Sequence, residues 1–512
     1  MNRKVTVFHR IAMALLMAAL LFPMSSVLPQ GGAHSVEAAG VKLHKPKRSN
    51  GKITYDCVRF GSYPQAEVVT ADLLKKYEAF QGGLFCDGNG RFIGDTLYQT
   101  LGRAQIGDTE GDFIVDDTLY QTLQTERGWD ADGAITLADG ERYCRIKRND
   151  AVTDWMSYID WENDATYHYF KYQPIKWRVL SVKKGEAFLL AQNGLDSYEY
   201  IRAGLNEEEL EVDELVELTW RKSMLRKWLN SYDHATQKGE IDKTKKGFID
   251  VAFNQKEKNA IKAKKFENKE YNFRSLGRAN YLSVKERKKG TSTKDKISIL
   301  SFDEAANKAY GFSAFYMRPD RARRFLPSAY AQAMGSYFAG YWQLRSVGFN
   351  QVVEIKPDGE MVAENLQHYM NYMVVPVLYL NTSASDVWSY AGTVSVEEIK
   401  NGLVKENGKY YYYKNNKKRT GYTGLIRNLT SKGTEMCYVK KGVWQSKYTG
   451  MVKHAGKWHY VKKGKKRSAT GLVKHTDGSL WYVKEGQWKS KYTGIVNGSD
   501  GQSYYVEKGR VK

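Results

Sequence analysis

The sequence predicts two kinds of structure in one chain: a globular α+β domain, followed by an all-β array of repeated hairpins. Between residues 55 and 382, short runs with strand character alternate with segments whose apolar residues recur at helical spacing. From residue 401 onward, glycine and a Tyr-Val pair recur at a nearly fixed period, which is typical of stacked supersecondary units.

Residues 1–39 have the three parts of a secretory signal peptide. The first residues are basic, residues 11–22 are apolar, and Val36-Glu37-Ala38-Ala39 offers small residues for cleavage. The apolar run is short for a membrane anchor, although an uncleaved N-terminal anchor is the alternative. We therefore expect a protein secreted across a bacterial-type membrane, extracellular or associated with the cell wall, whose mature chain begins near Gly40.

The net positive charge of the chain lies almost entirely in the repeats. Residues 401–512 hold 25 of the 79 Lys and Arg residues and 6 of the 57 Asp and Glu residues, so they carry +19 of the net charge of +22. A basic surface attracts anionic polymers. The expected partner is a cell-wall polymer, either teichoic acid or peptidoglycan glycan, and nucleic acid is the less favoured alternative because no nucleic-acid-binding fold is recognised.

The four cysteines leave two interpretations open. Cys57, Cys86 and Cys144 come early in the chain and Cys437 lies in the repeats. An oxidising compartment favours one disulfide among the first three, although their spacing does not choose the pair. The alternative is that they are small buried side chains. Because no Cys-x-x-Cys pair or histidine cluster is present, we expect no metal site and no cofactor.

The globular region, residues 55–382, lies between a basic spacer at 40–54 and a linker at 383–400. Its strands are predicted at 175–182, 187–191, 297–302, 341–346, 351–356 and 373–380, with a turn at Pro357-Asp358-Gly359. Helices are predicted at 219–229, capped by Thr219, and at 253–267. The heptapeptide at 95–101 recurs at 117–123, which indicates a local duplication or an inserted hairpin.

The tail consists of five units. Each begins with a glycine followed by an aliphatic residue or Met, at Gly402, Gly424, Gly450, Gly471 and Gly494. A longer period is also present, because Trp444-Gln-Ser-Lys-Tyr-Thr-Gly450 matches Trp488-Lys-Ser-Lys-Tyr-Thr-Gly494 after 44 residues. One hairpin cannot bury enough surface to be stable alone, so we expect stacked hairpins that share a column of Tyr, Trp and aliphatic residues.

The globular region resembles the DUF6273 family of secreted Firmicutes-type proteins. The stretches that carry the resemblance are 56–65, 174–181, 220–230, 252–253, 295–301, 327–331, 342–346, 358–359 and 375–378. The chain departs from the family pattern at Val347, where the family usually has Pro, and at Val375, where it usually has Arg. The closing pattern is similar to C-type-lectin-like and formylglycine-generating-enzyme-like domains, which implies an α+β fold of that kind.

The tail resembles the cell-wall-binding, choline-binding-like repeats of Gram-positive surface proteins, as in Gly-Lys-Trp-His-Tyr-Val at 456–461. Those repeats usually have Trp after the first glycine, where this chain has Leu, Met or Ile, and the departure argues against choline specificity. We therefore expect the remaining aromatic residues to stack on sugar rings, or alternatively to form the solenoid core. The candidate ligand-binding residues are Trp444, Trp458, Trp481, Trp488, Tyr448 and Tyr492.

In the globular domain, Trp342, Arg345 and Arg324 are the candidate site residues, and the alternative is that they serve the core and surface ion pairs. No Gly-x-Ser-x-Gly, His-Glu-x-x-His or P-loop motif occurs, which favours a binding protein over an enzyme. We expect a secreted, surface-associated protein whose repeats dock to wall polymer or glycan and whose ectodomain binds an unidentified ligand. An extracellular enzyme with an ectodomain active site, targeted by the tail, is the alternative.

Overall fold

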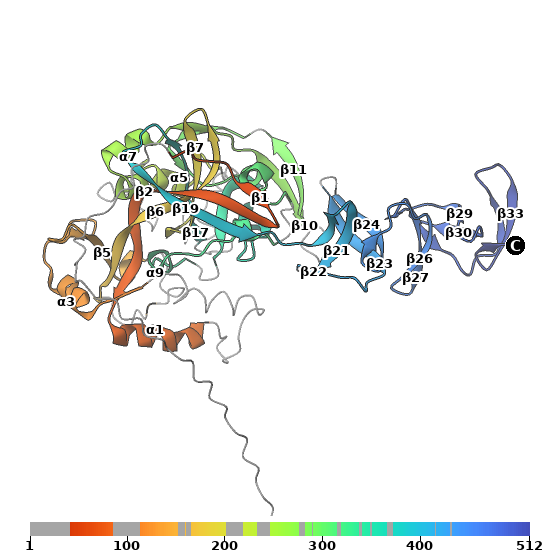
Figure 1. The fold of residues 1–512 in the computed structure, drawn as a ribbon, viewed down its shortest axis with the longest axis horizontal. Helices are drawn as coiled ribbons and strands as arrows, with labels where there is room; N and C mark the ends of the chain where they lie inside the picture. The colour runs from red at the N-terminus through yellow and green to blue at the C-terminus, as the bar shows by residue number, and fades with distance from the viewer. Residues whose placement is uncertain are drawn as a thin grey trace, which may run out of the picture. The chain divides into compact units, whose positions relative to one another are not determined.

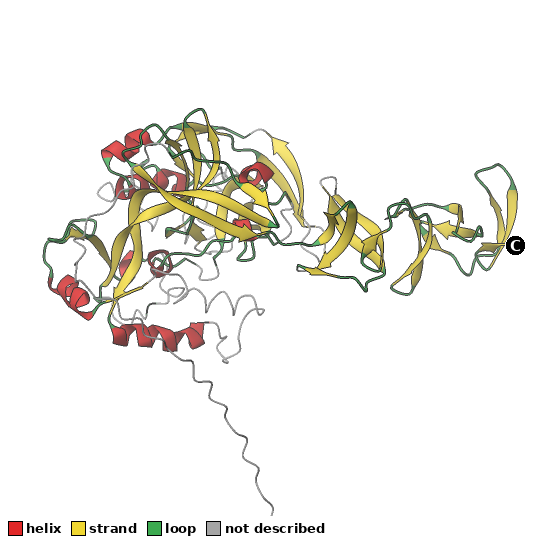
Figure 2. Ribbon diagram, in the orientation of Figure 1, coloured by secondary structure: helices red, strands yellow, loops and turns green. Residues whose placement is uncertain are grey.

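The structure is a computed structural model that describes most of the chain after residue 40 (Figure 1). The described residues are 41–84, 113–151, 159, 165–200, 219–232, 246–275, 282–288, 290–314, 319–336, 340–348, 351–365, 372–414, 416–430 and 433–512. The predicted signal peptide, Cys86 and the first copy of the heptapeptide lie outside them. Strands dominate the described residues, and the helices are short (Figure 2).

The globular domain is built on a ten-stranded sheet with two long central strands. β2 (Lys52–Val69) and β6 (His168–Lys183) run antiparallel, from Cys57 opposite Arg178 to Val68 opposite Tyr169. The strand order is β1-β2-β6-β7-β18-β13; β3 and β19 also pair with β2, β5 pairs with β6, and β4 pairs with β5. The other strands are β1 (Lys47–Ser49), β3 (Phe113–Val115), β4 (Ala134–Thr136), β5 (Arg142–Ile146), β7 (Glu186–Ala191), β13 (Ile297–Ser298), β18 (Val377–Asn381) and β19 (Trp388–Glu397).

A bulge in β2 depends on a glycine. The register between β2 and β6 shifts between Arg59 and Ser62, and Gly61, inside this interval, has φ of 69°. A Cβ at this position would lie 2.4 Å from the ring of Phe253 and 2.8 Å from the Ala252 carbonyl oxygen. Glycine therefore satisfies both the backbone conformation and the close approach of Phe253.

A seven-stranded sheet holds most of the late strands, in the order β11-β10-β14-β15-β16, with β17 between β14 and β8. Its strands are β8 (Asp196–Tyr198), β10 (Glu270–Ser275), β11 (Leu282–Lys288), β14 (Trp342–Gly348), β15 (Gln351–Ile355), β16 (Met361–Asn365) and β17 (Tyr372–Val374). A separate pair consists of β9 (Lys264–Phe266) and β12 (Thr293–Asp295). The strand predicted at 373–380 is divided around Val375-Pro376, so that β17 joins this sheet and β18 joins the first.

The helices are short and are capped mainly by Ser, Asn and Asp. They are α1 (Ala71–Leu84), α3 (Asp117–Thr125), α5 (Met224–Leu229), α6 (Phe248–Ala252), α7 (Gln255–Ala260), α8 (Phe302–Ala305) and α9 (Ala329–Ala333), with 3₁₀ turns η1 (Arg148–Asp150), η2 (Lys308–Tyr310) and η3 (Arg321–Arg323). The prediction that Thr219 caps the helix at 219–229 was wrong. Ser223 caps α5, because its Oγ accepts the backbone N–H of Arg226 at 3.2 Å.

Two further sequence predictions were wrong in their boundaries, because a capping residue starts a helix inside each predicted segment. The helix predicted at 253–267 is limited to α7, whose cap Asn254 forms a capping box with Glu257, and the chain then enters β9. The strand predicted at 297–302 ends after β13, because Ser301 caps α8. Asn254 and Ser301, which cap α7 and α8, therefore mark the starts of these helices.

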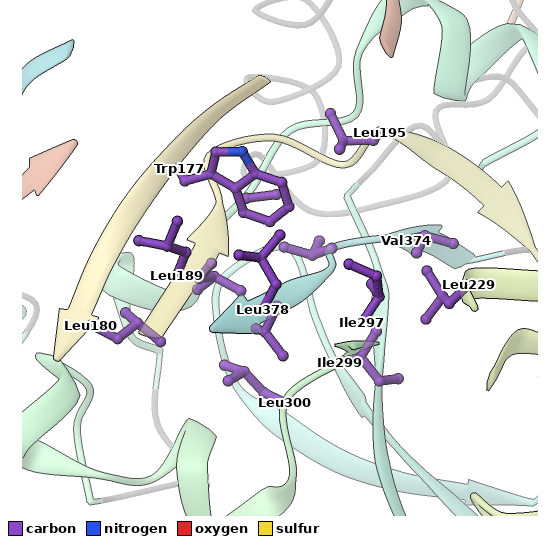
Figure 3. Packing of buried hydrophobic residues seen from close by; sticks show 14 of the residues in the cluster. Trp177, Leu180, Leu189, Leu195, Leu229, Ile297, Ile299, Leu300, Val374 and Leu378 are labelled. Carbon is purple, nitrogen blue, oxygen red and sulfur yellow. The ribbon is translucent and has the colours of Figure 1, made fainter. Parts of the chain in front are cut away.

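The two sheets share a continuous core that also takes in α5 and α6. Figure 3 shows part of it, where Trp177 of β6, Leu189 of β7 and Leu378 of β18 lie on the same side of the first sheet as Ile297 and Leu229. The Trp177 indole nitrogen donates to the Phe60 carbonyl at 2.8 Å, which satisfies the polar atom of a fully buried side chain.

The predicted linker at 383–400 contributes a strand to the globular domain. β19 pairs antiparallel with β2, from Trp388 opposite Phe60 to Glu397 opposite Lys52. The Trp388 side chain is buried, and its indole nitrogen donates to the Thr382 carbonyl at 3.3 Å. The polar composition misled the prediction, because only alternate residues of a surface strand face the solvent.

The predicted spacer at 40–54 is also structured. It contains β1 and the start of β2, and Arg48 donates to the carbonyls of Gly311 and Phe312 at 2.7 and 3.0 Å. Arg48 is also paired with Glu398 at 3.0 Å. The structure therefore differs from the predicted boundaries at both ends, because both segments continue the pairing of the first sheet.

The tail has five repeats, each a hairpin followed by a short third strand. They are repeat 1 with β20 (Gly402–Glu406), β21 (Lys409–Lys414) and β22 (Lys417–Lys418); repeat 2 with β23 (Gly424–Thr430), β24 (Gly433–Lys440) and β25 (Val443–Trp444); repeat 3 with β26 (Gly450–His454), β27 (Lys457–Lys462) and β28 (Lys465–Lys466); repeat 4 with β29 (Gly471–Lys474), β30 (Leu480–Lys484) and β31 (Gln487–Trp488); and repeat 5 with β32 (Gly494–Asn497), β33 (Ser503–Glu507) and β34 (Arg510–Val511).

The third strands connect the repeats. β25 pairs with β24 of its own hairpin and with β21 of repeat 1, and β28, β31 and β34 repeat this arrangement along the array. All 15 strands are thereby linked by backbone hydrogen bonds. The prediction of an all-β array of stacked hairpins is confirmed.

Replacing Trp388 with Ala should lower the stability of the globular domain by about 3 kcal/mol, because the substitution leaves a cavity beneath β19. Calorimetric unfolding of the full chain measures this effect. Thr393→Ala, an exposed substitution on the same strand, is the control. Equal unfolding temperatures for the two variants would show that β19 does not stabilise the domain.

Candidate functional site

Each repeat after the first opens on a glycine in a conformation that other residues rarely adopt. Gly424, Gly450, Gly471 and Gly494 have φ between 122° and 155°. A Cβ on Gly450 would lie 3.1 Å from both the Tyr448 hydroxyl and Nδ1 of His475. The periodic glycines therefore mark where the chain enters each hairpin, and at Gly450 it passes close to two side chains.

The threonine before each of these glycines holds the turn that leads to the third strand. Its Oγ1 accepts the backbone N–H of the first turn residue at 3.0–3.3 Å, in the pairs Lys441–Thr423, Lys463–Thr449, Glu485–Thr470 and Lys508–Thr493. In repeat 3 the turn residues Lys463 and Gly464 both have positive φ, as a type I′ turn requires. The third strand and its aromatic residue are thereby fixed in position.

Two of the predicted ligand-binding residues, Tyr448 and Tyr492, have equivalent structural contacts. Their hydroxyls donate to the carbonyls of Met451 at 2.8 Å and Ile495 at 3.3 Å. Their rings lie 4.8 Å from Tyr438 and 4.2 Å from Tyr482, respectively, between centroids. Both tyrosines are half-buried, so each supports its hairpin with one part of the ring and leaves another part accessible.

Neighbouring hairpins pack face to face. In repeat 3, Met451, Trp458 and Tyr460 lie on one face. This face contacts the opposite face of repeat 4, which presents Val473, Trp481 and Val483. Leu425 and Tyr438 of repeat 2 pack in the same way on Val452 and Val461 of repeat 3. The junctions of repeats 1–2, 2–3 and 3–4 therefore each have their own small core.

The junction between repeats 3 and 4 brings three of the predicted tryptophans together. The Trp481 ring lies 5.2 Å from Trp458 and 4.8 Å from Trp488, between centroids. His475 lies 5.3 Å from Trp481. Trp481 is buried, and Trp458 and Trp488 are half-buried. We call Trp458, Trp481 and Trp488 the repeat 3–4 cluster.

The fourth predicted tryptophan, Trp444, lies at the junction between repeats 1 and 2. Its ring packs edge-to-face with Tyr410, with centroids 5.4 Å apart. Its indole nitrogen donates to the Gly464 carbonyl at 3.1 Å, as that of Trp488 donates to Gly509 at 2.9 Å. We call Tyr410 and Trp444 the repeat 1–2 cluster. The sequence did not single out Tyr410, although Tyr410 has the same position in the hairpin of repeat 1 as Trp458 has in that of repeat 3.

The other two junctions have different residues at the same positions. The two clusters have an aromatic residue on the hairpin, Tyr410 or Trp458, and a tryptophan on the third strand, Trp444 or Trp488. At these positions the junction of repeats 2 and 3 has Met436 and Lys466. The junction of repeats 4 and 5 has Leu480 and Val511. The aromatic pair therefore occurs at every second junction, which explains the 44-residue period of the sequence.

A polar contact repeats across the junctions. The backbone N–H of Met451 donates to Nδ1 of His475 at 3.0 Å, and that of Leu425 donates to Nδ1 of His454 at 3.4 Å. In the first junction Asn428 Oδ1 accepts the N–H of Leu403 at 3.3 Å. In each case the side chain four residues after the opening glycine of a repeat accepts a backbone N–H. The donor is the second residue of the first strand of the preceding repeat.

The candidate residues of the globular domain are packed inside it or against it. Trp342 is fully buried, and its indole nitrogen donates to the Arg323 carbonyl at 3.1 Å. Arg345 is buried and paired with Glu304, with nitrogen–oxygen distances of 2.5 and 2.9 Å. Arg324 is half-buried, and burial lowers its pKa. The burial of Trp342 and Arg345 favours the alternative interpretation, a structural role.

The described cysteines are free and buried: Cys57, Cys144 and Cys437. Burial raises the pKa of the Cys437 thiol to about 11, so it is protonated at neutral pH. Within the described ranges, no group of three His, Cys, Asp or Glu residues has the geometry to hold a metal ion. In the same part of the chain, no helix has the length and apolar character needed to cross a membrane.

Two family models match the chain. Residues 184–382 match the domain of unknown function DUF6273, and residues 399–415, 447–466, 468–487 and 491–512 match the choline-binding repeat. The chain therefore contains a DUF6273 domain and C-terminal choline-binding repeats, as the sequence resemblance indicated. The matched ranges leave out repeat 2, which nevertheless has the same three strands as the others.

Two solved structures are similar to part of the chain. The structure of CbpJ from Streptococcus pneumoniae TIGR4 is 17% identical, with a TM-score of 0.12, over 31% of this chain and 56% of that chain. Alternansucrase in complex with isomaltononaose is 14% identical, with a TM-score of 0.09, over 32% of this chain and 16% of that chain. This chain therefore spans less than two thirds of either. Among curated proteins, none matches it.

The histidine contact predicts a specific pair of variants. His475→Ala removes the acceptor for the Met451 N–H and should destabilise the repeats by about 1–2 kcal/mol. His475→Asn should restore most of the loss, because Asn428 makes this contact naturally in the first junction. Urea unfolding followed by tryptophan fluorescence measures both. Equal losses in the two variants would assign the effect to packing of the imidazole ring instead.

Proposed function

We propose that the repeat array attaches the protein to a choline-bearing, anionic polymer of the bacterial cell wall. The carrying observation is the pair of aromatic clusters at alternate junctions, in a segment that matches choline-binding repeats. Aromatic faces attract quaternary ammonium groups through cation–π contacts. The attached polymer would hold the globular domain at the cell surface.

The repeats keep aromatic rings at their junctions although they lack Trp after the opening glycine. The residue after each glycine is Leu, Met or Ile where other repeats have Trp. In repeats 2 and 3 these residues, Leu425 and Met451, are buried in the junction cores. The aromatic rings of the clusters come from other positions, namely the second strand of the hairpin and the third strand. The repeat 1–2 cluster is the more accessible of the two, because Tyr410 is 37% exposed.

The charge of the repeats supports an anionic polymer as the ligand. Residues 401–512 carry a net charge of +19, and many of their lysines lie on exposed strand and turn positions. Teichoic acid, with phosphate groups along its backbone, offers both a negative charge and a site for choline substituents. Exposed charges act over about 8 Å at physiological salt, so they concentrate the polymer near the array, while the aromatic contacts supply selectivity.

The remaining predictions fit this proposal. The predicted signal peptide at 1–39 supports export to the Gram-positive surface, where wall polymers are found. The two sheets and short helices support an α+β fold in which strands dominate for the globular domain, whose central strands β2 and β6 lie before the DUF6273 match at 184–382. A C-type-lectin-like form of this fold stays a prediction. Binding of an unidentified ligand by this domain stays a prediction.

Trp444→Ala should reduce retention of the chain on isolated, choline-containing cell walls by about tenfold, because it removes one ring of the accessible cluster. Co-sedimentation of residues 40–512 with the walls measures retention, and free choline should release the wild-type protein. Walls stripped of teichoic acid should retain little of it.

Lys466→Ala is the matched control for Trp444→Ala. Lys466 has the same position on the third strand of repeat 3, in a junction without the aromatic pair, and its loss removes one positive charge. Retention should therefore fall only slightly. An equal fall in both variants, reversed by lower salt, would contradict the proposal and show that charge alone holds the chain to the wall.

A further inference from the structure

Arg510 is exposed, and it places a positive charge against the rings of the repeat 3–4 cluster. Its guanidinium carbon lies 4.1 Å from the ring centroid of Trp481 and 5.5 Å from that of Trp488. The two indole rings are inclined by 52° to each other, with centroids 4.8 Å apart. The guanidinium therefore contacts both rings at distances typical of cation–π pairs.

The backbone sets this position. Arg510 lies on β34 directly opposite Trp481 of β30 and opposite Glu507 of its own hairpin. The preceding turn is tied to the cluster as well, because the indole nitrogen of Trp488 donates to the Gly509 carbonyl at 2.9 Å. Repeat 5 thus presents Arg510 to the cluster of the preceding repeats through the same strand contact that connects the array.

The equivalent residue at the other cluster behaves differently. Lys465 of β28 lies opposite Cys437 in the same register, but its ammonium pairs with Glu435 at 2.8 Å. The nearest basic contact of the repeat 1–2 cluster is Lys405, whose ammonium is 5.9 Å from the Tyr410 centroid, at the outer limit of the interaction. Lys405 and Arg510 are both exposed, but Lys405 contacts one ring at this limit whereas Arg510 contacts two rings at shorter distances, so an incoming ligand displaces Lys405 more easily.

We propose that Arg510 is a specificity-determining residue that occupies the cation position of the repeat 3–4 cluster. A quaternary ammonium group would have to displace the guanidinium and would meet the repulsion of a like charge beside it. The repeat 3–4 cluster therefore excludes choline, and the repeat 1–2 cluster is the choline site of the array. This inference rests on the proposed function and makes the two clusters unequal.

The test is a calorimetric titration of residues 40–512 with choline chloride, which gives the number of sites per chain. The wild-type protein should bind choline at a single site, and Arg510→Gln should gain a second site, because both indole faces become free. Trp458→Ala in the Arg510→Gln background should remove the added site. Unfolding temperatures check that each variant is folded.

Two variants serve as controls. Arg510→Lys keeps a cation at the position and should bind like the wild type, and Lys465→Gln, in the same register at the other cluster, should also add no site. The proposal is overturned if Arg510→Gln has the same number of sites as the wild type, or if the wild type already binds at both clusters. A wild type without choline binding, together with a gained site in Arg510→Gln, would support the role of Arg510 and contradict only the proposed function.

Discussion

The packing of each hairpin on its neighbour is the interaction on which the repeat array depends. A two-stranded hairpin is at best marginally stable in water, and here the hairpins of repeats 1, 2 and 3 each cover an apolar face with the next hairpin. The third strand adds backbone hydrogen bonds to the hairpin before it. Every aromatic residue at a junction is therefore positioned both by its own repeat and by the adjacent one. A binding site built there needs no separate loop, because the contacts that stabilise the array also orient the rings.

This constraint means that core and binding surface overlap in the repeats. Trp444 and Trp488 each donate a hydrogen bond to the turn of the following repeat, yet their rings stay half-exposed. Trp481 is buried and contacts Arg510 through its ring. The two interpretations drawn from the sequence, solenoid core and ligand-binding surface, are thus compatible for the same residue. Variants of these residues need a stability measurement beside every binding measurement.

The repeats could be predicted from the sequence because their signals are local. The glycines mark positive φ, and the Tyr-Val pairs mark alternating faces of one strand. The alternation of the junctions could not be predicted, because it depends on which residues of successive hairpins meet. Tyr410 was missed for the same reason, since its partner Trp444 belongs to the next repeat. In the globular domain, the partial alternation at 175–182 predicted the second half of β6, and the apolar run at 187–191 predicted β7. β19 depends on pairing with β2, far away in the sequence, and the polar composition of 383–400 does not indicate this pairing.

Charge and aromatic contacts have different tasks in the array, and Arg510 connects them. Most lysines of the repeats are exposed, so their attraction for a polyanion is long-ranged and insensitive to the exact structure of the ligand. The clusters act only at contact distance, where the sign of the group over the ring decides what can bind. The Arg510 guanidinium lies over Trp481 and Trp488 and so takes the position that a ligand cation would occupy. Two clusters with similar tryptophans can therefore differ in ligand because of one residue on the neighbouring strand, which a comparison of aromatic positions alone would not reveal.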